Sequence, residues 1–403
     1  MRVLLIAQYF PPEIGAAASR WGDYVDILVQ RGHKVTVLCG MPNYPRGKRF
    51  DGYNNLWVKR ERKSSNLRII RSAVWANDRK STFKMLGNYL SFAFSGVINA
   101  MKIRNVDLIV LSSPPLFVGI IGMMLSSIRK YKMLLDVRDI WPESVVVLGG
   151  IKSKWLIKLG RLLESKVYRS ASGYIFPVPG FQKYFKSHHP LQMKKPMFNL
   201  MNGVHEDFLV KTKETQLASQ KDFTVLYSGN MGMAQGLEVV LEAASELKDY
   251  PIQFKLIGDG ICKTSLIQMA KSMGLSNMTF LDSISREALI SEMHNASVCL
   301  VPLKNNPLFR NAIPSKIFEI MACKKPVILG VEGEATCIIQ QYNCGTVVSP
   351  ENPLELKNII LKYFESKDLI IFHGNNGVRA VTEHLRKDVL LSTFLKCVNT
   401  TIN

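Results

Sequence analysis

Short apolar runs alternate with longer helical stretches along the first half of the chain. Runs of four or five apolar residues bounded by polar residues predict buried strands, and the 3.6-residue periodicity between them predicts helices. Because the strand runs are almost continuously apolar, helices should cover both faces of a parallel sheet. The expected strands are Val3–Ala7, Val35–Leu38, Leu108–Leu111, Met133–Asp136 and Gly173–Phe176, and the expected helices are Ser19–Arg31, 82–103, 116–130 and 153–170.

The second half repeats this plan after a polar stretch, Lys211–Asp222. Since 403 residues exceed the size of one compact core, we predict two doubly wound, Rossmann-like α/β domains that face a cleft. The expected division is 1–203, 204–380, and a C-terminal helix over 381–403 that packs back on the first domain. The further strands expected are Thr224–Tyr227, Gln253–Ile257, Met278–Leu281, Val298–Val301 and Val327–Leu329, with helices 235–247, 263–273, 286–296 and 315–324.

The excess positive charge lies entirely in the first half. Residues 1–200 hold 32 Lys and Arg against 11 Asp and Glu, whereas residues 201–403 hold 20 against 21. Residues 46–84 alone hold twelve Lys and Arg, and the uncharged, apolar stretch Met85–Met101 follows. This combination favours an anionic membrane surface over nucleic acid, for which no module is recognisable. A solvated basic face with a core helix behind it is the alternative.

The remaining composition indicates a cytoplasmic protein. The seven cysteines are scattered without a C-x-x-C, which disfavours a zinc centre and a disulfide framework. The segment Met1–Gln8 reads as a first strand rather than a signal peptide, and no apolar run is long enough to span a bilayer. We therefore expect a protein that is peripheral at the inner face of the plasma membrane.

Two loops of the first half follow predicted strands, where ligands of such sheets bind. The loop Tyr9–Ser19 carries Gly15 before a helix N-terminus, which suits a phosphate or a plain connection. The loop Asp136–Ser144 carries Arg138 and Asp139. Arg138 is a candidate phosphate ligand and Asp139 a candidate for orienting an acceptor hydroxyl, although an Arg–Asp pair that holds the loop is equally compatible.

The second half has a glycine-rich loop and a helix with two unusual charges. Tyr227–Gly236 offers Gly229 and backbone donors to an anion, with Asn230 and Gln235 as neutral donors. In Asn311–Ala322, Ser315 precedes an apolar helix that should be buried, yet the helix carries Lys316 and Glu319. Ribose hydroxyls would satisfy Glu319 and a diphosphate would meet Lys316; a Lys–Glu surface pair is the alternative.

Two acidic residues, Glu332 and Glu334, follow the next strand and are candidates for sugar hydroxyls, or belong to a solvated turn. The sequence lacks G-x-G-x-x-G, Walker and G-x-S-x-G motifs, which disfavours nicotinamide dinucleotides, nucleoside triphosphatases and serine hydrolases.

Taken in order, these loops resemble glycosyltransferase family 4, which has the GT-B fold. The similarity rests on Phe10–Gly15, Asn202–Val204, Ile257–Gly260 and Ser315–Ala322. Within that family, Asp136–Ser144, Ser228–Gly236, Ile313–Ala322 and Gly330–Ala335 are most similar to the WbuB-type L-fucosamine transferases of bacterial O-antigen or capsule assembly.

The resemblance implies that Gly15 backs a diphosphate and that Glu319 binds ribose. Two positions depart from the family pattern. The first Glu of its E-x7-E motif is Asn311 here, and the usual Arg and Lys of its glycine loop are Asn230 and Gln235. Lys316, with Arg310 or Arg138, would have to offset the charge of the leaving diphosphate.

The implied activity is retaining, metal-independent transfer from a UDP-sugar, with N-acetyl-L-fucosamine suggested, to an undecaprenyl-diphosphate-linked saccharide. No cofactor beyond the donor is expected. Two alternatives remain open: a UDP-sugar 2-epimerase of the same architecture, which would leave the basic half unexplained, and a non-catalytic binder in a membrane assembly.

Overall fold

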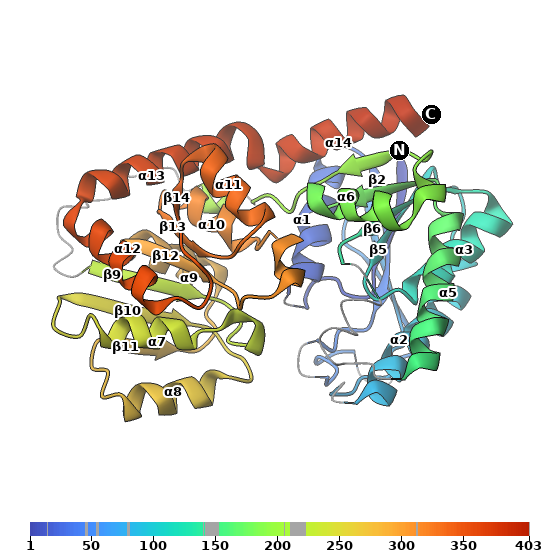
Figure 1. Cartoon of the computed structure of the whole chain (residues 1–403). Helices are drawn as coiled ribbons and strands as arrows, with labels where there is room; N and C mark the ends of the chain where they lie inside the picture. Colours follow the sequence, from blue (N-terminus) through green and yellow to red (C-terminus); the bar gives the residue numbers. More distant parts are fainter. Residues whose placement is uncertain are drawn as a thin grey trace. The chain divides into compact units, whose positions relative to one another are not determined.

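The computed structural model describes residues 1–13, 15–44, 47–53, 56–78, 81–139, 141, 153–204, 206–209, 223–311 and 313–402. The chain forms two compact units (Figure 1). Unit 1 comprises Met1–Asn202 and Leu390–Asn403, and unit 2 comprises Gly203–Val389. The predicted boundary after residue 203 lies one residue from this division. The predicted C-terminal segment starts earlier, at residue 381, than the point where the chain rejoins unit 1.

Unit 1 is built on a sheet of eight described strands. Its strands are β1 Arg2–Ile6, β2 Lys34–Gly40, β3 Val58–Arg62, β4 Leu67–Ser72, β5 Leu108–Ser113, β6 Lys132–Val137, β7 Gly173–Phe176 and β8 Met197–Asn199. Its helices are α1 Ala16–Gln30, α2 Thr82–Ala100, α3 Val118–Arg129, α5 Lys154–Ser170, α6 Pro179–His188 and, from Leu390 onward, α14 Lys387–Ile402. The strand order is β3-β4-β2-β1-β5-β6-β7-β8, and β3 is antiparallel to β4 while the other pairs are parallel.

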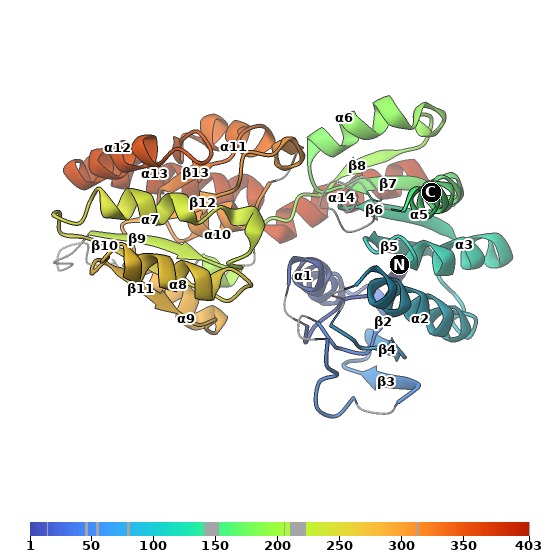
Figure 2. The same ribbon diagram turned by 60° about the horizontal axis from the view of Figure 1, so that its bottom comes forward.

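Helices cover both faces of this sheet, as the continuous apolar strands predict. Alternate strand residues such as Leu5, Val37 and Val110 pack against α1 and α14. Helices α2, α3 and α5 lie side by side on the opposite face (Figure 2). There a Cβ at Gly122 of α3 would collide with Met133 Sδ, which shows how closely α3 approaches β6.

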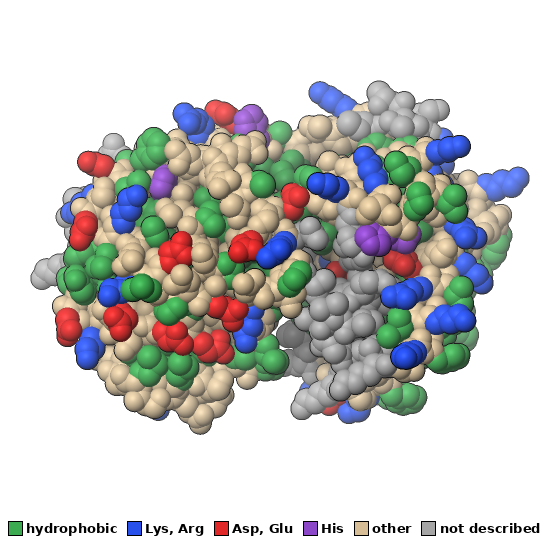
Figure 3. Space-filling model, in the orientation of Figure 1, with side chains coloured by type: hydrophobic (Ala, Val, Ile, Leu, Met, Phe, Trp, Pro, Cys, Tyr) green, Lys and Arg blue, Asp and Glu red, His purple; other side chains and the backbone are tan. Residues whose placement is uncertain are grey.

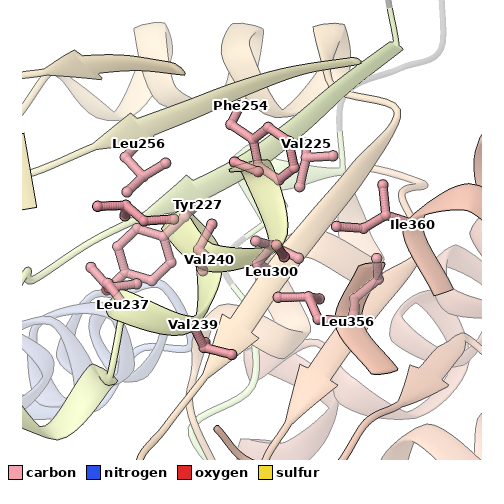
Figure 4. Close-up of a cluster of buried hydrophobic side chains, with 14 of the residues drawn as sticks. Val225, Tyr227, Leu237, Val239, Val240, Phe254, Leu256, Leu300, Leu356 and Ile360 are labelled. Carbon is pink, nitrogen blue, oxygen red and sulfur yellow. The ribbon is translucent and has the colours of Figure 1, made fainter. Parts of the chain in front are cut away.

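Unit 2 has a sheet of six described strands, all parallel, in the order β11-β10-β9-β12-β13-β14. These are β9 Phe223–Ser228, β10 Ile252–Ile257, β11 Met278–Leu281, β12 Val298–Pro302, β13 Val327–Gly330 and β14 Gly345–Val347. The helices are α7 Glu238–Ser245, α8 Lys263–Ser272, α9 Arg286–Asn295, α10 Lys316–Ala322, α11 Glu334–Tyr342, α12 Pro353–Glu365 and α13 Lys367–Ala380. Figure 4 shows one core layer, in which Val225, Tyr227 and Leu300 meet side chains of α7 and α12.

The chain returns to unit 1 at its end. Residues 381–385 form a π-helical turn within unit 2, and α14 follows. Leu391, Phe394 and Val398 of α14 are buried in the unit 1 core, and the ring of Phe394 lies 5.8 Å from that of Phe198. Unit 1 is therefore assembled from two segments that are almost 200 residues apart in the sequence.

Candidate functional site

In unit 2, the loops after β9 and β10 are bonded to each other through their backbones. The amide of Gly229 donates to the carbonyl of Ile257 at 2.8 Å, and the amide of Met231 donates to the carbonyl of Asp259, also at 2.8 Å. The phenol of Tyr227, the penultimate residue of β9, donates to the carbonyl of Asn230 at 2.6 Å. These bonds hold the glycine loop in one shape at the carboxyl edge of the sheet, where ligands of such sheets bind.

Lys316, the first residue of α10, reaches this loop. Its Nζ donates to the hydroxyl of Tyr227 at 3.1 Å and lies 4.3 Å from the centre of the Tyr227 ring. A Cβ at Gly229, whose φ is +133°, would overlap the end of the Lys316 side chain. Gly229 is therefore required both for the backbone conformation and for the approach of this ammonium group.

The environment of Lys316 perturbs its ionisation strongly. Burial removes water from the ammonium group and lowers the pKa of Lys316 to about 8, and the negative charge of Glu319 only partly opposes this. A half-desolvated cation beside a glycine-rich loop is suited to accept an anion.

Helix α10 is as buried as its composition predicts. Ile317, Phe318 and Ile320 are fully buried, whereas Glu319 is half-buried on the same side as Lys316. Its carboxylate influences the pKa of Lys316, so the two charges act on one another. Glu319 therefore lies with Lys316 on the polar face of an otherwise apolar helix.

The two neutral residues of the glycine loop stabilise the loop itself. The side-chain oxygen of Gln235 accepts from the amide of Gly232 at 3.0 Å, and the Asn230 amide lies beside Gly232 and Gly260. Both residues belong to the loop after β9, but the side-chain oxygen of Gln235 is already hydrogen-bonded within that loop.

The structure brings together two predicted residues that are distant in sequence. Arg310 forms an ion pair with Glu332 at 2.9 Å, and both side chains are about half exposed. Glu334 follows closely as the first residue of α11, where its charge is favourable near the helix N-terminus. Because both side chains of this pair are about half exposed, the guanidinium remains accessible to a further anion.

In unit 1, Gly15 caps the N-terminus of α1 with a φ of +154°, and its Cα faces the ring of Tyr44. The preceding Glu13 is buried and accepts from the amides of Phe10, Asn43 and Tyr44 at 3.2, 2.9 and 2.9 Å. Burial raises the pKa of Glu13, although these amides counteract it. Sequence reasoning gave Glu13 no role, yet this carboxylate fixes the loop that presents Gly15.

Asp136, the first residue of the motif Asp136–Ser144, is buried near the end of β6. Arg20 contacts its two oxygens at 3.1 and 3.0 Å, and the indole of Trp21 donates to it at 2.7 Å. The side chains of Arg20 and Asp136 are 1% and 0% exposed. Arg20 also donates to Asn202 and to the carbonyl of Leu200. This carboxylate therefore has a structural role, which its position at the end of a strand did not reveal.

The contacts of Arg138 fit neither of its two predicted roles fully, a phosphate ligand or one half of an Arg–Asp pair that holds the loop. Its Nη2 donates to the carbonyl of Pro114 at 2.8 Å, and its Nε lies 3.8 Å from Asp136, too far for a hydrogen bond. That Nε is buried and has no hydrogen-bond partner among the described residues. Burial lowers the pKa of Arg138. Asp139 is half-buried beside it, and residues 140 and 142–144 of the motif lie outside the described part of the chain.

Comparisons with known proteins agree with the sequence resemblance at the level of the family domain. Residues 211–372 match the family model described as Glycosyl transferases group 1, so unit 2 carries a domain of that type. The Escherichia coli (strain K12) protein named putative colanic acid biosynthesis glycosyl transferase WcaI is 26% identical over 347 residues, which cover 82% of this chain and 84% of the relative.

Solved structures establish the fold class. Sucrose-phosphate synthase from Thermosynechococcus elongatus superimposes with a TM-score of 0.76 at 18% identity, covering 100% of this chain and 99% of the other. Anabaena HepE in complex with UDP gives a TM-score of 0.70 at 16% identity, covering 99% and 100%. The predicted GT-B class, with two parallel α/β domains, is confirmed. The WbuB-type branch and the roles of the site residues remain predictions.

Proposed function

We propose that the protein is a retaining glycosyltransferase that moves a sugar from UDP to a lipid-linked saccharide in bacterial O-antigen or capsule assembly. The observation that carries this proposal is the Lys316 ammonium, half-desolvated against Tyr227 and the Gly229 loop in a group 1 domain. Burial lowers the pKa of Lys316, and a bound anion would favour its ammonium form again. N-acetyl-L-fucosamine is the sugar that the sequence resemblance suggests, and undecaprenyl diphosphate is the proposed carrier.

In this proposal the second unit binds the nucleotide. Lys316 and Arg310 meet the diphosphate, and Glu319 accepts hydrogen bonds from the ribose hydroxyls. The bond between the anomeric carbon and the diphosphate breaks, and its electron pair leaves with UDP. The cations stabilise this developing charge without a metal ion. Glu332 and Glu334 are placed to accept hydrogen bonds from the donor sugar.

The acceptor is assigned to the first unit. Asp139 orients the acceptor hydroxyl, whose oxygen forms the new glycosidic bond and whose proton is released with UDP. Arg138 adds positive charge near it, and Gly15 leaves room for the donor's diphosphate at the N-terminus of α1.

The proposed contact with an anionic membrane is supported by the outer surface of α2 and α5. Phe83 and Phe94 of α2 are 75% and 65% exposed, and Trp155 of α5 is 69% exposed, with Leu159 and Leu162 on the same stripe of that helix. Figure 3 shows Lys and Arg side chains clearly outnumbering acidic ones over unit 1. Within α2, α3 and α5 the one carboxylate is Glu164, which is buried. None of the described helices is long and apolar enough to cross a bilayer.

The test of the function is to offer a panel of UDP-sugars with a lipid-linked acceptor and to identify the product. A new glycosidic bond with retained anomeric configuration supports the proposal. An epimerised UDP-sugar formed without acceptor would select the 2-epimerase instead. Unchanged saccharide assembly in cells that carry Glu319→Ala would favour a non-catalytic binder.

Membrane contact is tested separately on the full chain with vesicles that contain about one-third anionic lipid. The double variant Trp155→Glu and Leu159→Glu should lose sedimentation with these vesicles, and high salt should release the wild type. Ile261→Glu, which alters an exposed apolar residue of unit 2, is the control. Equal sedimentation of the double variant and the wild type would refute this surface.

A further inference from the structure

A groove in unit 1 lies outside the residues assigned above. It has a volume of about 450 Å³, within the range of about 300–1,000 Å³ common for small-molecule sites. One wall is α1, at Gly22 and Asp26, and the other is formed by β3 and β4. Phe10, Pro11 and Pro12 of the loop after β1 close one end, and Tyr53 lines the rim.

A polar cluster in the groove is fixed by the pairing of β3 and β4. Glu61 of β3 is directly opposite Ile69 of β4, so Arg71, two residues further on, is its diagonal neighbour on the same face. Arg71 is almost fully buried, and its Nε donates to Glu61 Oε1 at 2.7 Å. The hydroxyl of Tyr53 donates to the same oxygen at 3.3 Å.

The second oxygen of Glu61 has a more weakly held partner. Its Oε2 is buried and forms an ion pair with the mostly exposed Lys63 ammonium at 3.3 Å. Burial opposes ionisation, but the hydrogen bond and charge of Arg71 outweigh it and lower the pKa of Glu61. The groove therefore offers an ionised carboxylate oxygen whose partner is a solvent-exposed ammonium, so a hydroxyl of a ligand can add a hydrogen bond to it.

The chemistry of the lining selects a class of ligand. The lining holds the carboxylates of Glu61 and Asp26 together with the cations of Lys63 and Arg71, so its charges balance and favour a neutral polar ligand over an anion. A purely apolar ligand would leave these polar groups without new partners in place of water. A pyranose ring satisfies both demands, because its hydroxyls donate hydrogen bonds and its C–H face packs on apolar surface. Phe10 and Pro11 supply that surface, and the ring of Tyr53, which also contacts the cations of Lys59 and Arg71, lies beside them.

We propose that this groove is a saccharide subsite that holds a pyranose ring of the acceptor. The inference rests on the proposed function for the source of the sugar. The groove is connected to the loop of Gly15: Arg71 Nη2 donates to the carbonyl of Pro11 at 2.6 Å, and Pro11 lies so close to α1 that a Cβ at Gly22 would collide with it. A sugar in the groove thus rests on the same loop that presents Gly15.

The test uses the full-length protein without UDP and a panel of methyl glycosides of glucose, galactose, N-acetylglucosamine and fucose, with saturation-transfer NMR as the readout. At least one glycoside should bind the wild type. Glu61→Gln and Tyr53→Ala should each weaken that binding about tenfold or more, since a hydrogen bond to a charged group and a ring contact are lost. Tyr53→Phe, which keeps the ring, should lose less than Tyr53→Ala.

Asp107→Asn is the matched control, because it removes another ion-paired carboxylate of unit 1, at Arg2. It should bind the glycosides as the wild type does, and every variant should retain its UDP affinity. Because Glu61→Gln leaves the buried Arg71 without its charged partner, its melting temperature should fall, and binding is therefore compared at a temperature at which every variant is folded. Lack of binding of all four glycosides, or equal binding by Glu61→Gln and Asp107→Asn, would overturn the subsite. Glycoside binding in the groove of a protein that transfers no sugar would refute the proposed function and leave the subsite intact.

Discussion

The charge of Lys316 predicts that UDP binding weakens as the pH rises. With a pKa of about 8, the ammonium form falls from about 90% at pH 7 to about 10% at pH 9. If the protonated form carries the affinity for the diphosphate, the association constant should fall about tenfold over this range. The direction is fixed by the lowered pKa, because a lysine at its usual pKa near 10.5 would stay charged throughout.

The measurement is isothermal titration calorimetry of UDP at half-unit steps from pH 6.5 to 9. Lys316→Met is the matched variant, because it keeps a long side chain against Tyr227 but carries no charge at any pH. It should bind UDP about 10–100-fold more weakly at pH 7, the value of a charge-assisted hydrogen bond of about 1.5–3 kcal/mol. The pH dependence of UDP affinity that remains in Lys316→Met reports the titration of UDP itself, and it can be subtracted from the wild-type profile.

A wild-type affinity that does not change between pH 7 and 9, or a Lys316→Met variant with the same pH profile as the wild type, would refute the reasoning. Heats measured in two buffers of different ionisation enthalpy add an independent readout. The wild type should take up protons when UDP binds near pH 8, because the bound phosphate raises the pKa of Lys316 again.

Three further predictions follow from the same contacts. Lys316→Met should increase the free energy of unfolding at pH 7 by about 1–3 kcal/mol, because a lysine with a lowered pKa destabilises the fold while it is charged in both the folded and the unfolded state. In urea titrations this gain in stability should disappear between pH 8 and 10.5, and a variant less stable than the wild type at pH 7 would contradict the prediction. Glu319→Ala should weaken UDP about tenfold but leave 2′,3′-dideoxy-UDP unaffected, and equal losses for both nucleotides would exclude ribose as its partner. Asp136→Ala should cost about 3–5 kcal/mol in urea unfolding, since it strands the buried Arg20, and a loss below about 1 kcal/mol would show that the pair is not desolvated.

Much of the central architecture could be predicted from the sequence because the buried strands are short, apolar and regularly spaced. Val3–Ala7 and Thr224–Tyr227 each fall within one residue of an observed strand. The prediction missed β3, β4, β8 and β14. For β3, Lys59, Arg60 and Arg62 hide the alternation of a strand within a basic segment, and β8 and β14 are only three residues long. Strand propensity depends on the neighbours across the sheet, and these are not local in sequence.

The candidate site could also be predicted only in part, because some of its contacts join residues that are distant in the sequence. The glycine loop and Lys316 could be found because small residues after a strand and a charge on an apolar helix are local signals. The pairing of Arg20 with Asp136 joins residues 116 positions apart, and the pairing of Arg310 with Glu332 depends on how two loops meet. Neither contact leaves a periodic or compositional trace, so these partners emerge only once the chain is folded.

Because residues 390–403 pack on unit 1, that unit cannot be produced as one continuous fragment of the chain. A fragment that ends at residue 202 would lack Leu391, Phe394 and Val398, and the apolar core residues that these side chains cover would be exposed to water. Such a fragment should self-associate unless a peptide covering 390–403 is added or is fused to its N-terminus through a linker. Residues 203–389, by contrast, are one uninterrupted stretch and form the better starting point for studying nucleotide binding in isolation.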